Sequence, residues 1–322
     1  MNSTKNVPDY LEILETALLG SVSIFGFLCN ALSFVILIRH RVFRNSFGYL
    51  AACEALSNAL TLLIFALWAT PWTFMEIPST IQWLNLYVGQ LSLATATSCF
   101  HCSLIIAINR FVAVMLPALY RQVFNERVTV VLLLIILIIS TLYFSLTFTG
   151  CEFYFDHDFH AWTFGEQPCS QSISLYIDTC YNLIVFVIIG SIDIVVFVRV
   201  RSARKKIMAS SGGNAEAENR KRAGRENRMF MQSLLSNCAY LFMLFSFHVL
   251  ARFTSAEFGL FMFTTWVWAA AHAAGGLILI YFNPEVKGHL VSVPHFVKFV
   301  WNPVTTIDTA TRTTAVVPSN KY

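Results

Sequence analysis

Long uncharged stretches are the main pattern along the chain. Between Met75 and Arg110 the only charged residue is Glu76. About 20 residues of helix cross the roughly 30 Å of hydrocarbon in a bilayer, and nearly uncharged stretches of that length occur seven times. The predicted spans are 14–38, 48–70, 86–109, 129–149, 173–198, 230–251 and 259–282.

Two other interpretations of these stretches fit less well. Strands of a membrane barrel alternate apolar and polar residues and run about 9–11 residues, whereas these runs are continuous and longer. Soluble domains carry about 25% charged residues, while this chain is 12% charged and 56% hydrophobic. The pattern therefore predicts an all-α membrane protein, a bundle of seven transmembrane helices.

The distribution of lysine and arginine predicts the orientation of the bundle. Basic residues gather on cytoplasmic loops, and placing the N-terminus outside leaves only Lys5 and Arg252 of the 22 basic residues on the outer side. The outer segment 150–172 carries four acidic residues and no lysine or arginine. We therefore expect the N-terminus outside and the C-terminus in the cytoplasm. The net charge of +4 then reflects a basic inner face beside membrane lipid, with no nucleic-acid partner implied.

The segments outside the spans divide the chain simply. We expect an extracellular tail over 1–13, a seven-helix domain over 14–290 and a cytoplasmic tail over 291–322. Asn2 begins the chain's one Asn-x-Ser/Thr sequence and is a candidate glycosylation site on the outer side. The inner loop 199–228 has two basic blocks around a Ser/Gly break, which predicts two helix extensions joined by a flexible tip.

The eight cysteines fall into two groups. Six lie within predicted spans, where a thiol behaves as a small apolar residue. Cys151 and Cys169 alone lie in an outer loop, the oxidising side where disulfides persist. We predict that they pair, which would stabilise the loop by roughly 3 kcal/mol in the chain-entropy model. The alternative is a pair of free thiols.

Two short sequences mix metal-ligand residue types. DHDFH, at 156–160, lies in the same outer loop, where nothing fixes the geometry of its histidines, so a solvated acidic loop is the favoured interpretation. CFHC, at 99–102, lies on a predicted helix, where adjacent side chains point apart and packing is favoured. We predict no metal site.

Polar residues within the spans indicate function by default, because they are costly in lipid. Asn30 and Glu54 lie at similar depths near the inner ends of spans 1 and 2, so we expect that they can meet. Span 5 carries Asp178, Asn182 and Asp193 along one stripe, which should face the bundle interior. The predicted intramembrane polar network is Asn30, Glu54 and Asp193. Ordinary hydrogen bonds between helices, and simple hydration of Asp178 at the interface, are the alternatives.

The outer halves of the spans are rich in large aromatic residues. Most belong to the interfacial belt, but a few can line an apolar cavity between helices, the usual form of a small-molecule site. The candidates on the outer side are Asp178, Tyr181, Asn182, Phe247, Trp268 and His272.

Three motifs occur in order along the first three spans. They are GFLCN at Asn30, LAACE at Glu54, and AINRFVAVMLPALY, which contains Arg110. Together they resemble the GN, LAxxD and DRY motifs of rhodopsin-like G-protein-coupled receptors. Finer features resemble the nematode serpentine chemoreceptors of class x: the NRF variant, the paired loop cysteines, YIDTCYN in span 5 and FNPEVK after span 7.

The resemblance implies roles for particular residues. Arg110 matches the arginine that holds the resting state and then meets the G protein, while Pro117 and Tyr120 match the second inner loop that contacts it. Asn109 stands where the family has an acidic residue, so one restraint on Arg110 is missing and other contacts are expected to hold it. Ser92, where amine receptors carry aspartate, joins the candidate pocket and disfavours a biogenic amine.

We therefore expect a chemosensory G-protein-coupled receptor in the plasma membrane, possessing no cofactor and activated by a small environmental or pheromone-like molecule. By resemblance its place is the sensory cilium of chemosensory neurons, and its partner a heterotrimeric G protein. A neuropeptide receptor is the alternative within the class, and a ligand-gated channel or transporter the alternative outside it. HExxH and GxSxG are absent from the sequence, which disfavours an enzyme.

Overall fold

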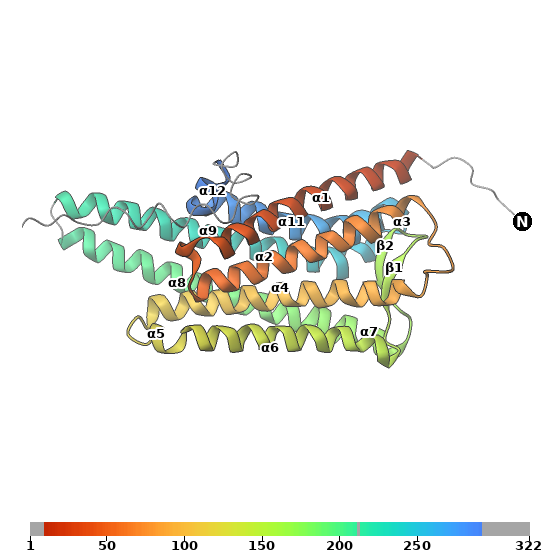
Figure 1. The fold of residues 1–322 in the computed structure, drawn as a ribbon, viewed down its shortest axis with the longest axis horizontal. Coiled ribbons are helices and arrows are strands. Elements are labelled where there is room, and N and C mark those ends of the chain that lie inside the picture. The colour runs from red at the N-terminus through yellow and green to blue at the C-terminus, as the bar shows by residue number, and fades with distance from the viewer. Residues whose placement is uncertain (1–9, 211–212, 292–322) are drawn as a thin grey trace, which may run out of the picture.

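The computed structural model describes residues 10–210 and 213–291. Asn2 and most of both predicted tails lie outside these ranges, and so does the glycosylation expected at Asn2. Within the described ranges, seven helices are long and apolar enough to cross a membrane, which confirms the predicted bundle. Figure 1 shows them side by side along the long axis of the molecule.

The first four spans are mainly α-helical. The first is α1 (Tyr10–Arg39), followed by the short helix η1 (Arg41–Phe43). The second is continuous from α2 (Ser46–Ile64) through the π-helical turn η2 (Phe65–Ala69) to α3 (Thr70–Phe74). The third is α4 (Leu84–Met115), and the fourth is α6 (Glu126–Ser145), preceded by α5 (Tyr120–Val123) and followed by η3 (Leu146–Thr149).

The last three spans contain π-helical or 3-10 segments near one end. The fifth runs through α7 (Pro168–Ser172), η4 (Ile173–Tyr181) and α8 (Asn182–Ser210). The sixth is α9 (Gly213–His248) with η5 (Leu250–Phe253), and the seventh comprises α10 (Glu257–Phe261), η6 (Met262–Trp266) and α11 (Val267–Phe282). A last short helix is α12 (Pro284–Val291).

Most helices extend past the predicted spans. For example, α4 continues to Met115 and α1 begins at Tyr10. Hydropathy marks the part of a helix that lies in hydrocarbon, while backbone hydrogen bonds carry the helix on into the polar interface. Two helices begin at a side-chain N-cap. Asn45 accepts from the backbone N–H of Gly48 at the start of α2, and Asn125 accepts from that of Val128 at the start of α6.

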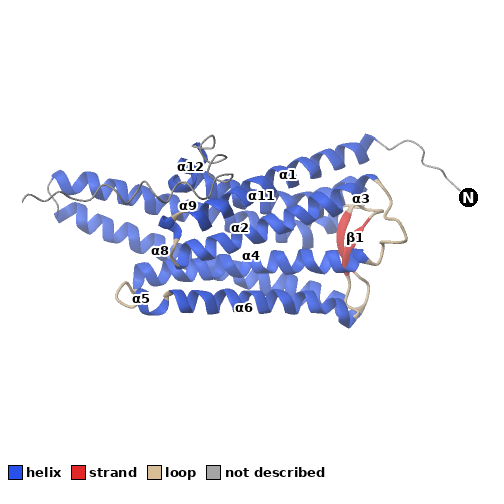
Figure 2. Cartoon of the chain, in the orientation of Figure 1, coloured by secondary structure: helices blue, strands red, loops and turns tan. Residues whose placement is uncertain are grey.

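The two ends of the bundle differ in structure. One end carries a β-hairpin of β1 (Phe153–Asp156) and β2 (Ala161–Phe164), with Phe153 opposite Phe164 and Asp156 opposite Ala161. We call this the hairpin end, and it is a small departure from the all-α expectation (Figure 2). The other end, which contains Arg39 and Arg110, is called the basic end, and there α8 and α9 project beyond the remaining helices (Figure 1).

The projecting parts of α8 and α9 correspond to the predicted inner loop 199–228. Helix extends to Ser210 on one side and from Gly213 on the other, as the sequence predicted for the flanks of the break. The rings of Phe197 and Phe230 stack with centroids 4.1 Å apart and join the two helices near the bundle. At His40, the residue before η1, the imidazole ring stacks on that of His289 of α12, with centroids 3.6 Å apart. Burial and the charge of His289 lower the pKa of His40.

Helix α4 lies at the centre of the bundle, against α2, α6 and α8. The core follows it from end to end, with Phe100, Cys99 and Ala107 buried. Helix α6 is peripheral and exposes Leu134, Leu137 and other large apolar residues, as a helix facing lipid tails should. Polar side chains are instead buried inside the bundle, where they form the sites described next.

Candidate functional site

Arg110 lies at the basic end of α4 and joins three helices. Its Nη2 lies 3.1 Å from Oδ1 of Asp193 on α8 and donates a hydrogen bond of 2.5 Å to Oγ of Ser233 on α9. The Ser233 hydroxyl in turn donates to Oδ2 of Asp193 at 2.5 Å. Because Asp193 is buried and Arg110 nearly so, the two charges compensate each other where solvent screens them little. The sequence did not identify these contacts, which join Arg110 to α8 and α9.

Glu54 on α2 faces the same region. Its Oε1 accepts a hydrogen bond of 2.5 Å from Ser103 of α4, about two helical turns before Arg110. Glu54 and Arg110 both line a cavity of about 30 Å³, which also touches Tyr240. That volume is enough for a water molecule. We call it the arginine cavity.

The predicted network of Asn30, Glu54 and Asp193 is divided in the structure. Asn30 donates from its amide to the backbone oxygens of Gly26 and His272, at 2.9 and 3.1 Å. No hydrogen bond between described residues joins Asn30 to Glu54. The expectation that they meet is therefore wrong, because Asn30 faces α11 while Glu54 faces α4.

The residues predicted at the second inner loop lie beside Arg110. Asn109 is buried, and its Oδ1 lies 3.4 Å from the hydroxyl of Tyr120, which begins α5. Pro117 is exposed in the turn between α4 and α5. Of these three, Asn109 faces the bundle and Pro117 is accessible at the basic end.

A second polar group lies in the middle of the bundle, on four helices. Oδ1 of Asn58 on α2 is 2.6 Å from Nδ1 of His272 on α11 and 3.1 Å from both the Tyr240 hydroxyl of α9 and Sγ of Cys99 on α4. All four residues are buried. Sequence reasoning missed Asn58 and Tyr240, although an amide in the middle of a span is a signal in itself.

A third site is a cavity near the hairpin end, here called the hairpin-end cavity. It has a volume of about 20 Å³ and touches α4, β1, η4, α9 and α11. The lining residues are Leu93, Ala96, Thr97, Phe100, Phe153, Asp178, Met243, Leu244, Phe247 and Trp268.

Asp178 is the charged residue of this lining, and it is held by two neighbours. Its Oδ2 accepts from Nε2 of His248 on α9 at 2.8 Å, and its Oδ1 accepts from the amide of Asn182 at 3.1 Å. Asp178 lies in the π-helical segment η4, whose wider turn changes the phase of the helix. The sequence placed Asp178 on the interior stripe of span 5 but did not identify His248 as its partner.

The predicted pocket residues are brought together only in part. Asp178, Phe247 and Trp268 line the hairpin-end cavity, and Asn182 adjoins it through Asp178. Three other predicted residues do not line this cavity. The Ser92 hydroxyl donates to the Gly89 carbonyl of its own helix. The Tyr181 hydroxyl lies 2.7 Å from Nε2 of His101, and His272 contacts Asn58. Tyr181 is exposed, whereas His272 is fully buried.

The β-hairpin covers the hairpin-end cavity and is fastened at its base. Cys151 and Cys169 form the disulfide expected from the sequence, with Cα atoms 5.4 Å apart. The amide of Gln90 donates to the Cys151 carbonyl at 2.9 Å, and that of Asn85 to the Phe155 carbonyl at 2.8 Å. Asn85 thus binds the loop by hydrogen bonds, since its Oδ1 also accepts from the backbone N–H of Phe155 at 3.2 Å.

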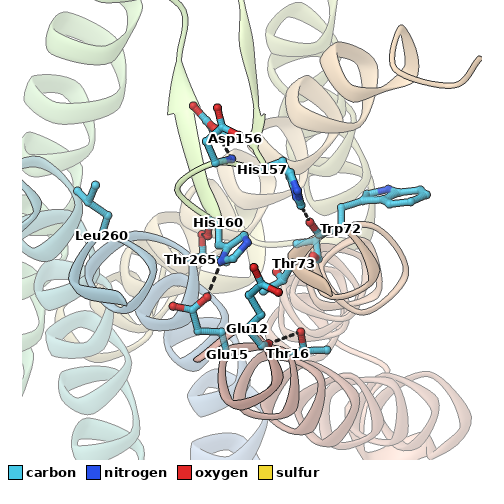
Figure 3. Close-up of polar contacts among 12 residues, drawn as sticks. Glu12, Glu15, Thr16, Trp72, Thr73, Asp156, His157, His160, Leu260 and Thr265 are labelled. Atoms are coloured by element: carbon cyan, nitrogen blue, oxygen red, sulfur yellow. Dashed lines mark hydrogen bonds and ion pairs between the residues drawn. The ribbon is translucent and has the colours of Figure 1, made fainter. Parts of the chain in front are cut away.

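The turn of the hairpin is fastened to the first and last spans (Figure 3). Nδ1 of His160 lies 2.5 Å from Oε2 of Glu15 on α1, and both side chains are buried. The His160 carbonyl accepts from the Thr265 hydroxyl of η6 at 2.9 Å. His157 contacts the Trp72 carbonyl at 2.7 Å. Each histidine of DHDFH therefore has a protein partner, and in the described part of the chain no group of three ligand residues is arranged for a metal.

Comparison with known proteins identifies the family. The family model of the serpentine type seven-transmembrane chemoreceptors, Srx, matches residues 21–283. The chain belongs to the Srx chemoreceptor family. Among its relatives is serpentine receptor class X 45 of Caenorhabditis elegans, 24% identical over 295 residues that cover 87% of this chain and 81% of the relative.

The fold of this Srx chain is that of rhodopsin. The crystal structure of squid rhodopsin superimposes with a TM-score of 0.74 and covers 92% of this chain and 89% of its own, at 14% sequence identity. At that identity the likeness concerns the fold. The Srx chain is thus a multi-pass membrane protein of a receptor family, with the arginine motif and the covered cavity at opposite ends of one bundle.

Proposed function

We propose that this Srx chain is a chemosensory receptor that binds a small environmental or pheromone-like molecule in the hairpin-end cavity and activates a heterotrimeric G protein at the basic end. The observation that carries the proposal is the Arg110 cluster. An arginine tied to Asp193 and Ser233 holds α4, α8 and α9 together, which is the resting arrangement expected of a receptor whose G protein later takes up that arginine.

The orientation needed for this role is supported by charge. The basic end contains the projecting helices α8 and α9, and the hairpin end carries the acidic segment 150–172. Basic residues favour the cytoplasmic side. The ligand side is then outside the cell, with the receptor in the plasma membrane and, by its family, in the cilium of a chemosensory neuron.

A short route connects the two ends. Phe100 lines the hairpin-end cavity, and its ring lies 5.3 Å from the ring of Tyr240. Tyr240 in turn lines the arginine cavity beside Arg110. Only one layer of side chains, which includes the Asn58 group, therefore separates the cavities.

Ligand binding can act along this route by moving α9. The hairpin-end cavity has room for about a water molecule at present, so a larger ligand must widen it. Met243 and Leu244 form its α9 wall, and α9 also carries Ser233. A ligand that fits the widened arrangement better shifts the equilibrium toward it, and the same displacement weakens the Arg110 cluster.

The test uses receptor expressed in cells with a panel of Gα subtypes and a library of small molecules. We expect a ligand that stimulates nucleotide exchange, and loss of that response in Arg110→Ala with surface expression preserved. Ligand-evoked currents in cells lacking G protein, unaffected by Arg110→Ala, would instead favour a channel. A tag at the N-terminus that is found inside the cell would reject the proposed orientation.

A further inference from the structure

The hairpin-end cavity presents a single kind of charge to a ligand. Of the hydrogen-bonded pair at its edge, Asp178 lines the cavity whereas His248 does not. His248 occupies Oδ2 from the α9 side, and Asn182 occupies Oδ1 along the helix. A carboxylate accepts about four hydrogen bonds, so Asp178 can still receive a donor from the cavity.

The remaining walls suit a cation as well. Four of the ten lining side chains are aromatic: Phe100, Phe153, Phe247 and Trp268. The Trp268 ring lies 5.8 Å from that of Phe153 and 6.4 Å from that of Phe247, so the rings surround a common space. Aromatic faces attract organic cations, most strongly where water is excluded, and apolar walls with one carboxylate are poor surroundings for an anion.

The hairpin above the cavity adds a field of the same sign. Glu152, Asp156, Asp158 and Glu166 lie within 150–172, and no lysine or arginine balances them there. Burial, and after it the neighbouring carboxylates, raise the pKa of Tyr154 on β1. Such a surface raises the local concentration of cations and their rate of arrival.

We propose that the ligand of this receptor is a small organic cation, an amine with an apolar or aromatic group, whose nitrogen binds Asp178 inside the aromatic walls. This inference rests on the proposed function, and it replaces the sequence argument against an amine. That argument depended on Ser92, which bonds to Gly89 of its own helix and does not line the cavity. The carboxylate comes from span 5 instead.

The ammonium group shares the carboxylate with His248 or displaces it. In either case the pair that joins η4 to α9 is altered, since His248 belongs to α9. The apolar part of the amine then presses on Met243, a flexible side chain that adapts to ligands of different shape.

The test measures binding without a G protein. Purified full-length receptor is heated with matched compounds of one carbon skeleton each: phenethylamine, phenethyl alcohol and phenylacetate, and isopentylamine, isopentanol and isovalerate. We expect an amine to raise the unfolding midpoint, while its alcohol and carboxylate partners do not. Asp178→Asn should lower the affinity for the amine by about 10–100-fold, as the loss of a charged hydrogen bond does. Glu257→Gln, which removes an exposed carboxylate at the same end, should leave binding unchanged.

One further variant and one separate assay keep the outcome decisive. Phe247→Leu removes one aromatic wall but preserves the carboxylate, and it should selectively weaken binding of the amine. It replaces Asp178→Asn in the test if that variant does not fold. Binding of a carboxylate or alcohol in preference to its amine, no stabilisation by any amine, or full amine binding by both variants overturns the proposal. Amines that bind without stimulating nucleotide exchange on any Gα would leave the cation site standing and count against the proposed G-protein coupling.

Discussion

Asp193→Asn is the change that tests the Arg110 cluster most directly. It keeps the size of the side chain and an oxygen that can accept from Ser233, but it removes the negative charge 3.1 Å from Arg110. Since Asp193 is only 3% exposed, solvent screens this pair weakly. We expect the resting arrangement to lose stability relative to the active one, because Arg110 then loses the negative charge of Asp193.

The magnitude follows from the kind of contact. Hydrogen bonds to charged groups contribute about 1.5–3 kcal/mol, and each ~1.4 kcal/mol is a tenfold change in an equilibrium. The ratio of active to resting receptor should therefore rise roughly 10- to 150-fold. If about 1% of unliganded wild-type receptor is active, the active fraction of the unliganded variant should lie between roughly a tenth and three-fifths.

The assay is ligand-free nucleotide exchange by purified Gα with receptor in lipid nanodiscs, normalised to folded receptor. Glu257→Gln, an exposed carboxylate at the hairpin end, is the matched charge-removing control. Ser233→Ala should raise basal exchange less, because a neutral hydroxyl contributes only about 0.5–1.5 kcal/mol. Basal exchange in Asp193→Asn equal to wild type, in receptor that still responds to ligand, would refute the idea that this pair restrains the resting state.

Three further predictions concern the hairpin and its attachment. Cys151→Ser should abolish the mobility difference between reduced and oxidised receptor on gels and lower loop stability by about 3 kcal/mol. Gly89→Ala places a methyl group against the β1 backbone and should lower the unfolding midpoint, by overpacking of about 1–3 kcal/mol, whereas Gly224→Ala, which meets open space, should not. Glu15→Gln leaves His160 without its buried carboxylate and should cost about 3–5 kcal/mol; stability equal to wild type would mean that the contact holds no ion pair.

The bundle could be predicted because one physical rule governs it. Hydrocarbon requires helices of a fixed length, so charge-free runs locate the spans even though they miss the helix ends at Tyr10 and Met115. The hairpin was missed because its strands have four residues each and its turn uses His160 at positive φ, without the Asn-Gly or Asp-Gly signal of a tight hairpin.

The sequence predicted which residues belong to the site better than it predicted which of them contact one another. Asp193 and Arg110 were each identified from the sequence, but which helix faces which depends on packing between distant segments, and so their contact was not. Glu54 and Asn30 illustrate the same limit, since equal depth in the membrane does not fix the direction in which a side chain points. Ser233 and Tyr240 carry little signal of their own and acquire their roles from the residues they touch.

The two attachments of the hairpin also impose an order on the making of the molecule. The disulfide joins cysteines 18 residues apart, so its loop can close while the chain is still emerging. The contact of His160 with Glu15 spans 145 residues, and its contact with Thr265 spans 105 toward the C-terminus. Since synthesis runs from the N-terminus, the turn cannot complete its docking until the seventh span has been inserted. The β-hairpin can thus be cross-linked early, but it docks on the bundle last. A docked hairpin therefore indicates that all seven spans have assembled.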